Sequence, residues 1–162
     1  MQREHQTGDL SEQYPGLSAE VRHRNVALVE RMYELFNKGD LEAVKREVFA
    51  PDVVWNLPGR SPVGGVKNGP DEIIAFFGGL VRTGIQVDLE RIDSWGEDTV
   101  VEVHLGHGES GGVSLNALNC THYRIQDGKI AQVQVYLSDQ YGADNFFWAT
   151  IEMAPIPDRW AN

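Results

Sequence analysis

The sequence predicts an α+β domain in which a strongly bent, cone-shaped antiparallel β-sheet wraps around three N-terminal helices. Apolar residues recur at helical spacing through the first half of the chain, and after Gly84 they recur at every second residue. Asp127-Gly128 then separates two long β-rich runs. Helices that precede a run of antiparallel strands are typical of the α+β class. Long strands bend, so we expect the sheet and the helices to enclose a pocket.

Three helices are predicted from apolar periodicity and from capping residues. The first begins at an N-cap on Ser18 and ends near Gly39, which can take the left-handed cap conformation. Asp40 is the predicted N-cap of a second helix, and Pro51 is expected to stop it. The third begins at Pro70, because proline is well tolerated in a first helical turn.

A short strand is predicted before the third helix and four longer ones after it. The expected strands cover 53–57, 85–90, 101–105, 113–126 and 129–139. Asp127-Gly128 is a strong hairpin signal, because a type I′ turn needs positive φ at both central residues. Further turns are expected at 95–98 and in the glycine-rich segment 106–112. The loop 60–69, rich in Gly and Pro, is either a lid over the pocket or a plain connection.

The length of 162 residues and the composition fit a single domain. We expect an N-terminal tail over 1–17, the domain over 18–150 and a C-terminal extension over 151–162. The net charge of −10 argues against a nucleic-acid partner and against an anionic membrane surface. Cys120 is the sole cysteine, which excludes an intrachain disulfide. No segment reads as a secretory signal or a membrane span, so we expect a cytoplasmic protein. The aromatic residues after Gln140 are expected to cover the sheet, the pocket mouth or a dimer interface.

Four strings resemble the nuclear transport factor 2-like superfamily, close to its SnoaL-like polyketide cyclase and ketosteroid isomerase-like branch. They are VERMYELFNKGDLEAV, FAPDVVWNLPGRSPVGGVKNGPDEIIAFF, HYRIQDGKIAQVQVY and SDQYGADNFFW, in that order along most of the chain from Asn25 to Trp148. The resemblance implies the α+β cone, also described as a cystatin-like α+β barrel. It says little about the reaction, because this fold includes both enzymes and pure binding proteins.

The resemblance implies that most of the family's functional residues are replaced by residues of another type in this chain. The general-base aspartate of ketosteroid isomerases falls on Leu57, and their oxyanion-hole aspartate falls on Thr121. Their oxyanion tyrosine falls on Met32, next to Tyr33, and the acidic residue of epoxide hydrolase-like members falls on Val135. The resemblance therefore argues against steroid isomerisation by the family mechanism.

The same alignment implies which residues face the pocket. The candidate substrate-binding residues are Tyr33, Trp55, Leu57, Asn119, Thr121, Tyr123 and Val135. Asn119 and Thr121 could hold a substrate oxygen, or they could satisfy each other or a buried water. Trp55 could stack on a flat ligand or serve as core packing. A mostly apolar, aromatic cavity of this kind is typical of a small-molecule site.

Three residues are candidates for acid–base catalysis. Asp139 is the only carboxylate on the presumed pocket side of the last strand, although it could instead cap the following turn. His104 alternates with Val101, Val103 and Leu105, so it points away from the pocket if those residues face the core. His122 is the third candidate, and it could equally be packed or lie in an interface. A register error of one residue would exchange these assignments.

These observations favour a cofactor-independent enzyme of secondary metabolism that acts on an apolar, oxygenated small molecule. The expected reaction is a cyclisation, dehydration or isomerisation by proton transfer in the pocket, with no cofactor and no metal. The alternative is a non-catalytic small-molecule-binding protein with the same fold. A third possibility is an interaction module that uses the outer face of the sheet. The resemblance and the aromatic C-terminal segment suggest a homodimer.

Overall fold

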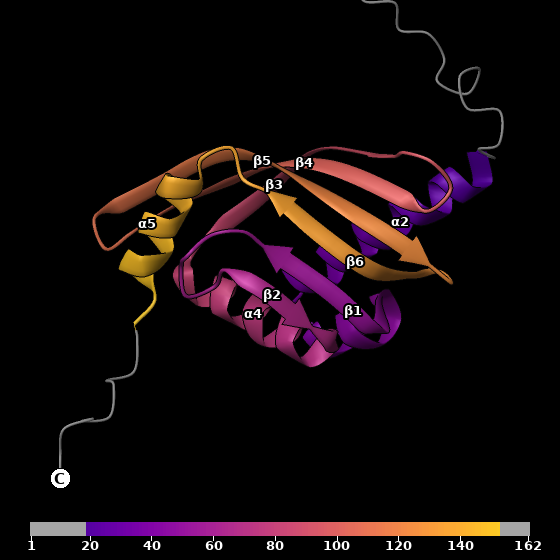
Figure 1. Ribbon diagram of the computed structural model, residues 1–162, viewed down its shortest axis with the longest axis horizontal. Coiled ribbons are helices and arrows are strands. Elements are labelled where there is room, and N and C mark those ends of the chain that lie inside the picture. Colours follow the sequence, from indigo (N-terminus) through magenta and orange to yellow (C-terminus); the bar gives the residue numbers. More distant parts are fainter. Residues whose placement is uncertain (1–18, 153–162) are drawn as a thin grey trace, which may run out of the picture.

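Six strands form one sheet in the order β2-β1-β6-β5-β4-β3, with helices against it (Figure 1). The computed structural model describes residues 19–152, so the predicted N-terminal tail, the Ser18 cap and most of the C-terminal extension lie outside the described residues. The elements in chain order are α2 (Ala19–Asn37), α3 (Leu41–Ala43), η1 (Val44–Val48), β1 (Phe49–Leu57), β2 (Gly65–Asn68), α4 (Gly69–Thr83), β3 (Gln86–Ser94), β4 (Thr99–Ser110), β5 (Val113–Gln126), β6 (Lys129–Tyr136) and α5 (Gln140–Thr150). The α+β class predicted from the sequence is confirmed.

The predicted caps on Gly39 and Asp40 are present, and Gly84 caps α4 in the same way as Gly39 caps α2. Gly39 has φ +73° after α2, and Gly84 has φ +72° after α4, a conformation that costs a residue with a Cβ atom more than glycine. The Asp40 side chain accepts a hydrogen bond from the backbone N–H of Ala43 at 3.0 Å. The second helix differs in form from the prediction, because α3 passes directly into the π-helical turn η1.

The hairpin at Asp127-Gly128 is confirmed, since both residues have positive φ (50° and 71°). It joins β5, which has 14 residues, to β6. β1 pairs with β6 in parallel, and β1 pairs with β2 in antiparallel orientation. The parallel pair was not predicted, and neither β2 nor α5 was predicted as an element.

Two expected boundaries are wrong. The second helix ends at Val48, and Pro51 lies inside β1. It is exposed and falls within a register shift between Phe49 and Val54, where the strand needs no N–H for its ladder. The segment 106–112 is mostly strand: β4 continues to Ser110, and the turn to β5 consists of Gly111-Gly112 alone.

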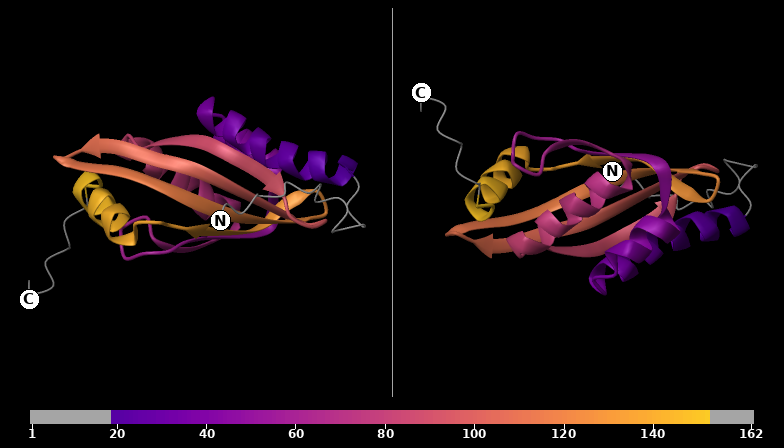
Figure 2. Two further views of the ribbon diagram at one scale, coloured as in Figure 1. Left: turned by 90° about the horizontal axis from the view of Figure 1, so that it is seen from above. Right: turned by 90° about the horizontal axis from the view of Figure 1, so that it is seen from below.

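The helices α2 and α4 contribute buried residues to one core on the inner face of the sheet, among them Met32 and Phe77. At one end of the sheet α5 lies beside the β4–β5 turn, where Gly111 closely approaches Ala149 (Figures 1 and 2). At the other end α2 reaches the β3–β4 turn, where Asn25 Nδ2 donates to the carbonyl of Glu97 at 2.7 Å. None of the helices in the described region has both the length and the apolar character needed to cross a membrane.

Candidate active site

A cavity of about 390 Å³ lies between the inner face of the sheet and the helices α2, α4 and α5. This volume falls within the range of small-molecule sites. Three of its lining residues, Asn37, Gln86 and Asp88, are exposed to solvent. They mark the mouth, which lies where the end of α2 meets the start of β3.

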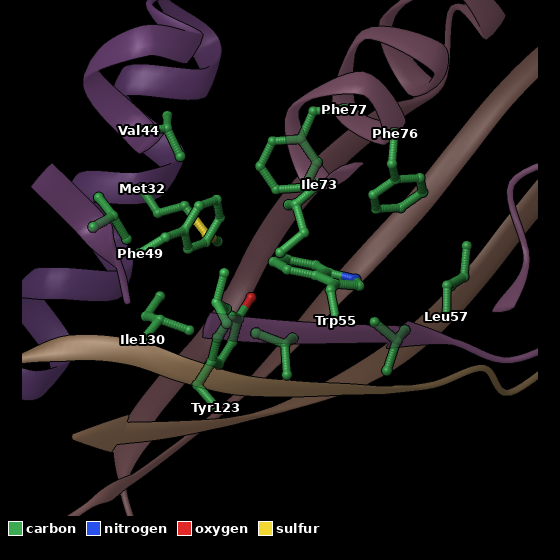
Figure 3. Packing of buried hydrophobic residues seen from close by; sticks show 14 of the residues in the cluster. Met32, Val44, Phe49, Trp55, Leu57, Ile73, Phe76, Phe77, Tyr123 and Ile130 are labelled. Atoms are coloured by element: carbon green, nitrogen blue, oxygen red, sulfur yellow. The ribbon is translucent and has the colours of Figure 1, made fainter. Parts of the chain in front are cut away.

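Aromatic side chains form much of the cavity wall, and Trp55 is at their centre (Figure 3). Its ring makes edge contacts with Phe77 at 5.1 Å and with Tyr123 at 6.1 Å between centroids. Phe36 from α2 makes a further edge contact with Phe77 at 5.1 Å. Such contacts fix ring orientations as well as excluding water, so this wall is rigid and apolar.

Away from the mouth, most polar side chains of the wall lie on β4 and β5. Glu102 pairs with Thr121 across the two strands, and His104 pairs with Asn119. Paired residues share a face of the sheet, and so do residues two apart on one strand. These four side chains therefore form one inward-facing polar group. His104, Asn119 and Thr121 line the cavity, with Glu102 behind them.

Glu102 has only 1% of its surface exposed, which is unusual for a carboxylate. Its Oε1 atom lies 3.0 Å from Nδ1 of His104, and Oε2 lies 3.2 Å from the same nitrogen. The hydroxyl of Tyr123 donates to Oε1 at 3.4 Å. Burying a charged group is costly unless it is hydrogen-bonded, so these partners are what allow Glu102 to occupy the position.

The neighbours of His104 fix its tautomer. Nδ1 faces the Glu102 carboxylate, which only accepts, so Nδ1 carries the proton. Asn119 Oδ1 accepts from the backbone N–H of Ser138 at 3.3 Å, which directs the Nδ2 group of Asn119 toward His104 Nε2 at 3.4 Å. Nε2 is therefore an acceptor on a side chain that lines the cavity. A carboxylate on Nδ1 and an unprotonated Nε2 form the arrangement of a general base, and a substrate would replace the long contact from Asn119 at Nε2.

Two tyrosines adjoin this pair, Tyr33 from α2 and Tyr123 from β5, and both line the cavity. Burial, followed by the charge of Glu102, raises the pKa of Tyr33 well above its usual value. Burial, followed by the proximity of Tyr33 and of Glu102, raises the pKa of Tyr123 in the same direction. Both phenols are thus neutral hydrogen-bond donors at physiological pH. Glu102 and His104 could also ligate a cation, but no third His, Cys, Asp or Glu joins them in the described part of the chain.

The structure brings most of the sequence-predicted residues to the cavity wall. All seven candidate substrate-binding residues line it: Tyr33, Trp55, Leu57, Asn119, Thr121, Tyr123 and Val135. Of the three candidate catalytic residues, His104 lines it, whereas Asp139 and His122 do not. The side chain of Asp139 is an N-cap that accepts from Gly142 N at 2.8 Å. Because His122 pairs with Val101 and alternates with the inward-facing Thr121 and Tyr123, it lies on the outer face of the sheet.

The condition under which His104 would point away from the pocket is not met, because Val101, Val103 and Leu105 do not face the core. The inward positions of β4 are the alternate ones, where Val100, Glu102 and Gly106 are buried. His104 therefore faces the cavity. Glu102 faces inward as well, and its place in the site was not predicted from the sequence.

At the α5 end of the cavity, the helix that lines it is fastened to the connection between β1 and β2. Asp144 of α5 accepts hydrogen bonds from the backbone N–H groups of Arg60 and Ser61, each at 3.0 Å. Trp148 Nε1 donates to the carbonyl of Arg60 at 3.1 Å. Ala143 and Phe147, on the same helix, line the cavity. The loop predicted as a possible lid is therefore fastened to α5, and its second half forms the strand β2.

The sequence is similar to a known domain family and to curated proteins. Residues 29–133 match the model of the SnoaL-like domain, which is more than half of the chain. An uncharacterised protein of Mycobacterium tuberculosis is 28% identical over 125 residues, covering 75% of this chain and 94% of the relative. Neither comparison assigns a reaction.

Solved structures agree with the fold. Bal32a, from a soil-derived mobile gene cassette, aligns with a TM-score of 0.71 and 28% identity, covering 78% of this chain and 98% of its own. An NTF2-like protein of Burkholderia xenovorans aligns with a TM-score of 0.67 and 17% identity, covering 78% and 97%. These similarities confirm the nuclear transport factor 2-like fold that the four sequence strings indicated. With its SnoaL-like match over most of the domain, the chain belongs to the SnoaL-like domain family.

Proposed function

We propose that the protein is a cofactor-independent enzyme that moves a proton on an apolar, oxygenated small molecule bound in this cavity. His104 is the acid–base group in this proposal, in place of Asp139. The observation that carries it is the hydrogen bond between Glu102 and His104 Nδ1, which leaves Nε2 as a proton acceptor beside an apolar cavity. A cyclisation, a dehydration or an isomerisation would each need such a group.

The chemistry follows from the positions of the groups. His104 Nε2 takes a proton from the substrate, and the carboxylate of Glu102 stabilises the positive charge that then develops on the ring. Tyr33 stays protonated, so its hydroxyl can donate to a substrate oxygen on which negative charge grows, whereas the hydroxyl of Tyr123 already donates to Glu102. The same nitrogen can return the proton at another atom, which completes an isomerisation or starts the loss of water. The aromatic wall excludes bulk water from this exchange.

The proposed ligand is small, largely apolar and oxygenated. Trp55, Phe36 and Phe77 provide flat apolar surface, and the buried polar side chains of the wall lie mainly on β4 and β5. The chain's negative charge and the scarcity of cationic side chains in the cavity disfavour a nucleic acid. A cytoplasmic location remains part of the proposal.

We also propose that the protein is a homodimer. The outer face of the sheet carries an apolar row formed by Val103, Cys120 and Tyr136, which are paired across three strands. Leu118 and Tyr136 are more than half exposed. Apolar surface of this kind is commonly covered in an assembly. Sedimentation of the wild-type protein and of Leu118→Glu tests this, and a monomeric wild type would contradict it.

The experiment that tests the catalytic proposal follows hydrogen–deuterium exchange at the α carbon of 1-tetralone by NMR in D₂O. We expect the wild type to accelerate exchange and His104→Gln to lose the acceleration by about 10²- to 10⁴-fold. His23→Gln, at an exposed position of α2, is the matched control and should behave as the wild type. Asp139→Asn and His122→Gln test the two other candidates from the sequence.

The outcome also separates the two functions considered for this fold. Exchange that His104→Gln removes, with the Kd for 1-tetralone retained, supports the enzyme. Saturable binding with no exchange above the background rate supports the non-catalytic binding protein. Exchange that is lost in Asp139→Asn and kept in His104→Gln would overturn the assignment of His104.

A further inference from the structure

The Trp55 side chain carries a hydrogen-bond donor without a partner. Within residues 19–152, its Nε1 atom is the one buried side-chain nitrogen or oxygen that has no hydrogen-bond partner. An indole N–H that is buried normally finds an acceptor, because an unpaired donor loses its hydration with nothing in return. The other buried polar atoms of the cavity wall have partners. This orphaned donor therefore points to an acceptor that a ligand would supply.

The surrounding rings hold this donor in place. Edge contacts with Phe77 and Tyr123 fix the plane of the Trp55 ring, so the N–H cannot turn outward to solvent. Figure 3 shows the nitrogen edge of the ring on the side of Leu57 and Phe76. Both of these residues, like Trp55 itself, line the cavity. The donor is itself buried, so it lies just beneath the part of the cavity wall built by β1 and α4, and a ligand reaches it when the side chains of Leu57 and Phe76 shift.

A buried cation adjoins this part of the wall. Lys67 of β2 is the direct cross-strand neighbour of Trp55, and only 8% of its surface is exposed. Its Nζ atom lies 4.4 Å from the centroid of the Phe76 ring and donates to the carbonyl of Gly65 at 2.8 Å. No carboxylate pairs with it among the residues that the structure describes. The carbonyls of Val63 and Gly65 and the Phe76 ring stabilise its charge, which lies behind the wall and adds a field that favours electron-rich atoms near Phe76 and Trp55.

The cavity consequently has two polar regions, one that favours a proton donor on the ligand and one that favours an acceptor. The pair formed by Glu102 and His104 accepts a proton, whereas the Trp55 N–H and the nearby Lys67 favour an acceptor oxygen. The ring of Tyr123 lies between them, since it contacts Trp55 and its hydroxyl contacts Glu102. A rigid ligand that binds to both polar regions must carry an acidic proton at one end and a carbonyl oxygen at the other.

We propose that Trp55 Nε1 is the binding subsite for a carbonyl oxygen of the substrate, and that the substrate is a flat, conjugated ketone whose acidic proton faces His104. This inference deepens the proposed function and rests on it for the role of His104. When Nε2 takes the proton, the electron pair of the broken bond enters the conjugated system. The carbonyl π pair moves onto the oxygen, where the Trp55 N–H meets the negative charge. No other reactant is needed.

Equilibrium binding of two matched compounds tests this without any turnover. The first, 6-hydroxy-1-tetralone, has a phenol conjugated with a ketone, and the second, 5,6,7,8-tetrahydro-2-naphthol, lacks only the ketone. By calorimetry we expect the wild type to bind the ketone about tenfold more tightly, the usual scale for one buried hydrogen bond. Trp55→Phe should reduce this preference to less than about twofold, whatever the loss of ring surface does to the affinity that the two compounds share. Trp95→Phe, at an exposed turn, is the matched control and should keep the preference.

The wild-type protein provides a second readout that survives even if Trp55→Phe fails to fold. The chain has four tryptophans, so the ¹H–¹⁵N spectrum contains few indole signals. The Trp55 signal should move downfield with the ketone and stay in place with the naphthol. Equal shifts for the two compounds, a preference that persists in Trp55→Phe, or no saturation by either compound at millimolar concentration would each overturn the proposal. If His104→Gln keeps the ketone preference while exchange is absent from every variant, the subsite stands and the proposed catalysis fails.

Discussion

Nδ1 of His104 lies 3.0 Å from Oε1 of Glu102, two residues earlier on the same strand. Side chains at i and i+2 share a face of a sheet, so β4 presents the base and its carboxylate together. No loop has to close to assemble the pair. Its geometry depends instead on the register with β5, which supplies Asn119 opposite His104 and Thr121 opposite Glu102.

Replacing Glu102 by Gln should impair catalysis while keeping the shape of the side chain. The neutral amide cannot stabilise a protonated imidazole, and its NH₂ group can donate to Nδ1, which would favour the tautomer with the proton on Nε2. We expect the tetralone exchange rate to fall by about 10²-fold or more, with the ligand Kd changed far less. Exchange by Glu102→Gln at the wild-type rate would show that His104 acts without its carboxylate.

The hairpin and the helix caps were predictable because their chemistry is local. Asp127-Gly128 needs positive φ at both residues, and Gly39 ends a helix in the left-handed conformation wherever the helix packs. The inward face of β5 was predictable too, because the hairpin and the family strings fix its phase. These features depend on neighbours in sequence and little on tertiary context.

The phase of β4 was not predicted, because both of its faces carry apolar residues. Val103 lies on the outer face beside Cys120 and Tyr136, whereas the inner face holds Glu102 and His104, which are stabilised by partners from another strand. Apolar alternation alone therefore indicated the wrong face. One signal was available: taking Gly111-Gly112 as a two-residue turn pairs His104 with Asn119, which was already expected to face inward. The density of glycines from 106 to 112 instead suggested a long turn.

The Asp139 variants distinguish a helix cap from a catalyst. The Asp139 side chain accepts from Gly142 N in the first turn of α5. Asn caps about as well as Asp, so Asp139→Asn should leave the free energy of unfolding nearly unchanged, and Asp139→Ala should lower it by about 1 kcal/mol. Denaturant unfolding measures this difference. Tetralone exchange should stay within about twofold of wild type in both variants, and a large loss in Asp139→Asn would restore Asp139 as a catalytic candidate.

Lys67 should make the protein more stable as the pH rises above 8. Burial lowers the pKa of Lys67 from its usual 10.5 to about 8. Between these values the unfolded chain binds more protons than the folded one at this residue, so the free energy of unfolding increases with pH. The gain should be roughly 1 to 3 kcal/mol by the upper end of that window.

Urea unfolding at about pH 7 and pH 9.5 measures this effect in the wild type and in Lys67→Met. The variant should lack the increase, because it has no amine to titrate. Lys38→Met is the matched control, since the Lys38 side chain is 61% exposed, and it should keep the wild-type slope. Equal pH slopes for wild type and Lys67→Met would contradict the prediction.

Tyr123 should make the protein less stable as the pH rises above about 10. Its pKa in the folded protein lies well above the ordinary value of 10.0, chiefly because the phenol is buried. Above pH 10 the unfolded chain loses a proton that the folded chain retains, so the free energy of unfolding falls as the pH rises. Tyr123→Phe should weaken this decline. In an ultraviolet titration, tyrosinate absorbance from Tyr33 and Tyr123 should appear only as the protein unfolds, and early titration of all five tyrosines would contradict the account.

Asp144 should stabilise both the fold and the position of α5 in the cavity wall. Its carboxylate accepts the backbone N–H groups of Arg60 and Ser61, and hydrogen bonds to a charged group contribute about 1.5 to 3 kcal/mol. Gly59, just before them, has φ +123° and comes so close that a Cβ atom would lie 2.4 Å from Asp144 Oδ1. The backbone is thus shaped to meet this carboxylate. Asp144→Ala should therefore lower the free energy of unfolding by about 1 to 3 kcal/mol.

The same substitution should weaken ligand binding, because α5 carries Ala143 and Phe147 of the cavity wall. Calorimetry with 6-hydroxy-1-tetralone should show a several-fold higher Kd for Asp144→Ala, together with faster amide exchange at Arg60 and Ser61. Asp52→Ala, at an exposed position on β1, is the matched control and should change neither quantity. A stable Asp144→Ala protein with unchanged affinity would show that the loop is held by Trp148 and Gln140, which donate to the carbonyls of Arg60 and Pro58.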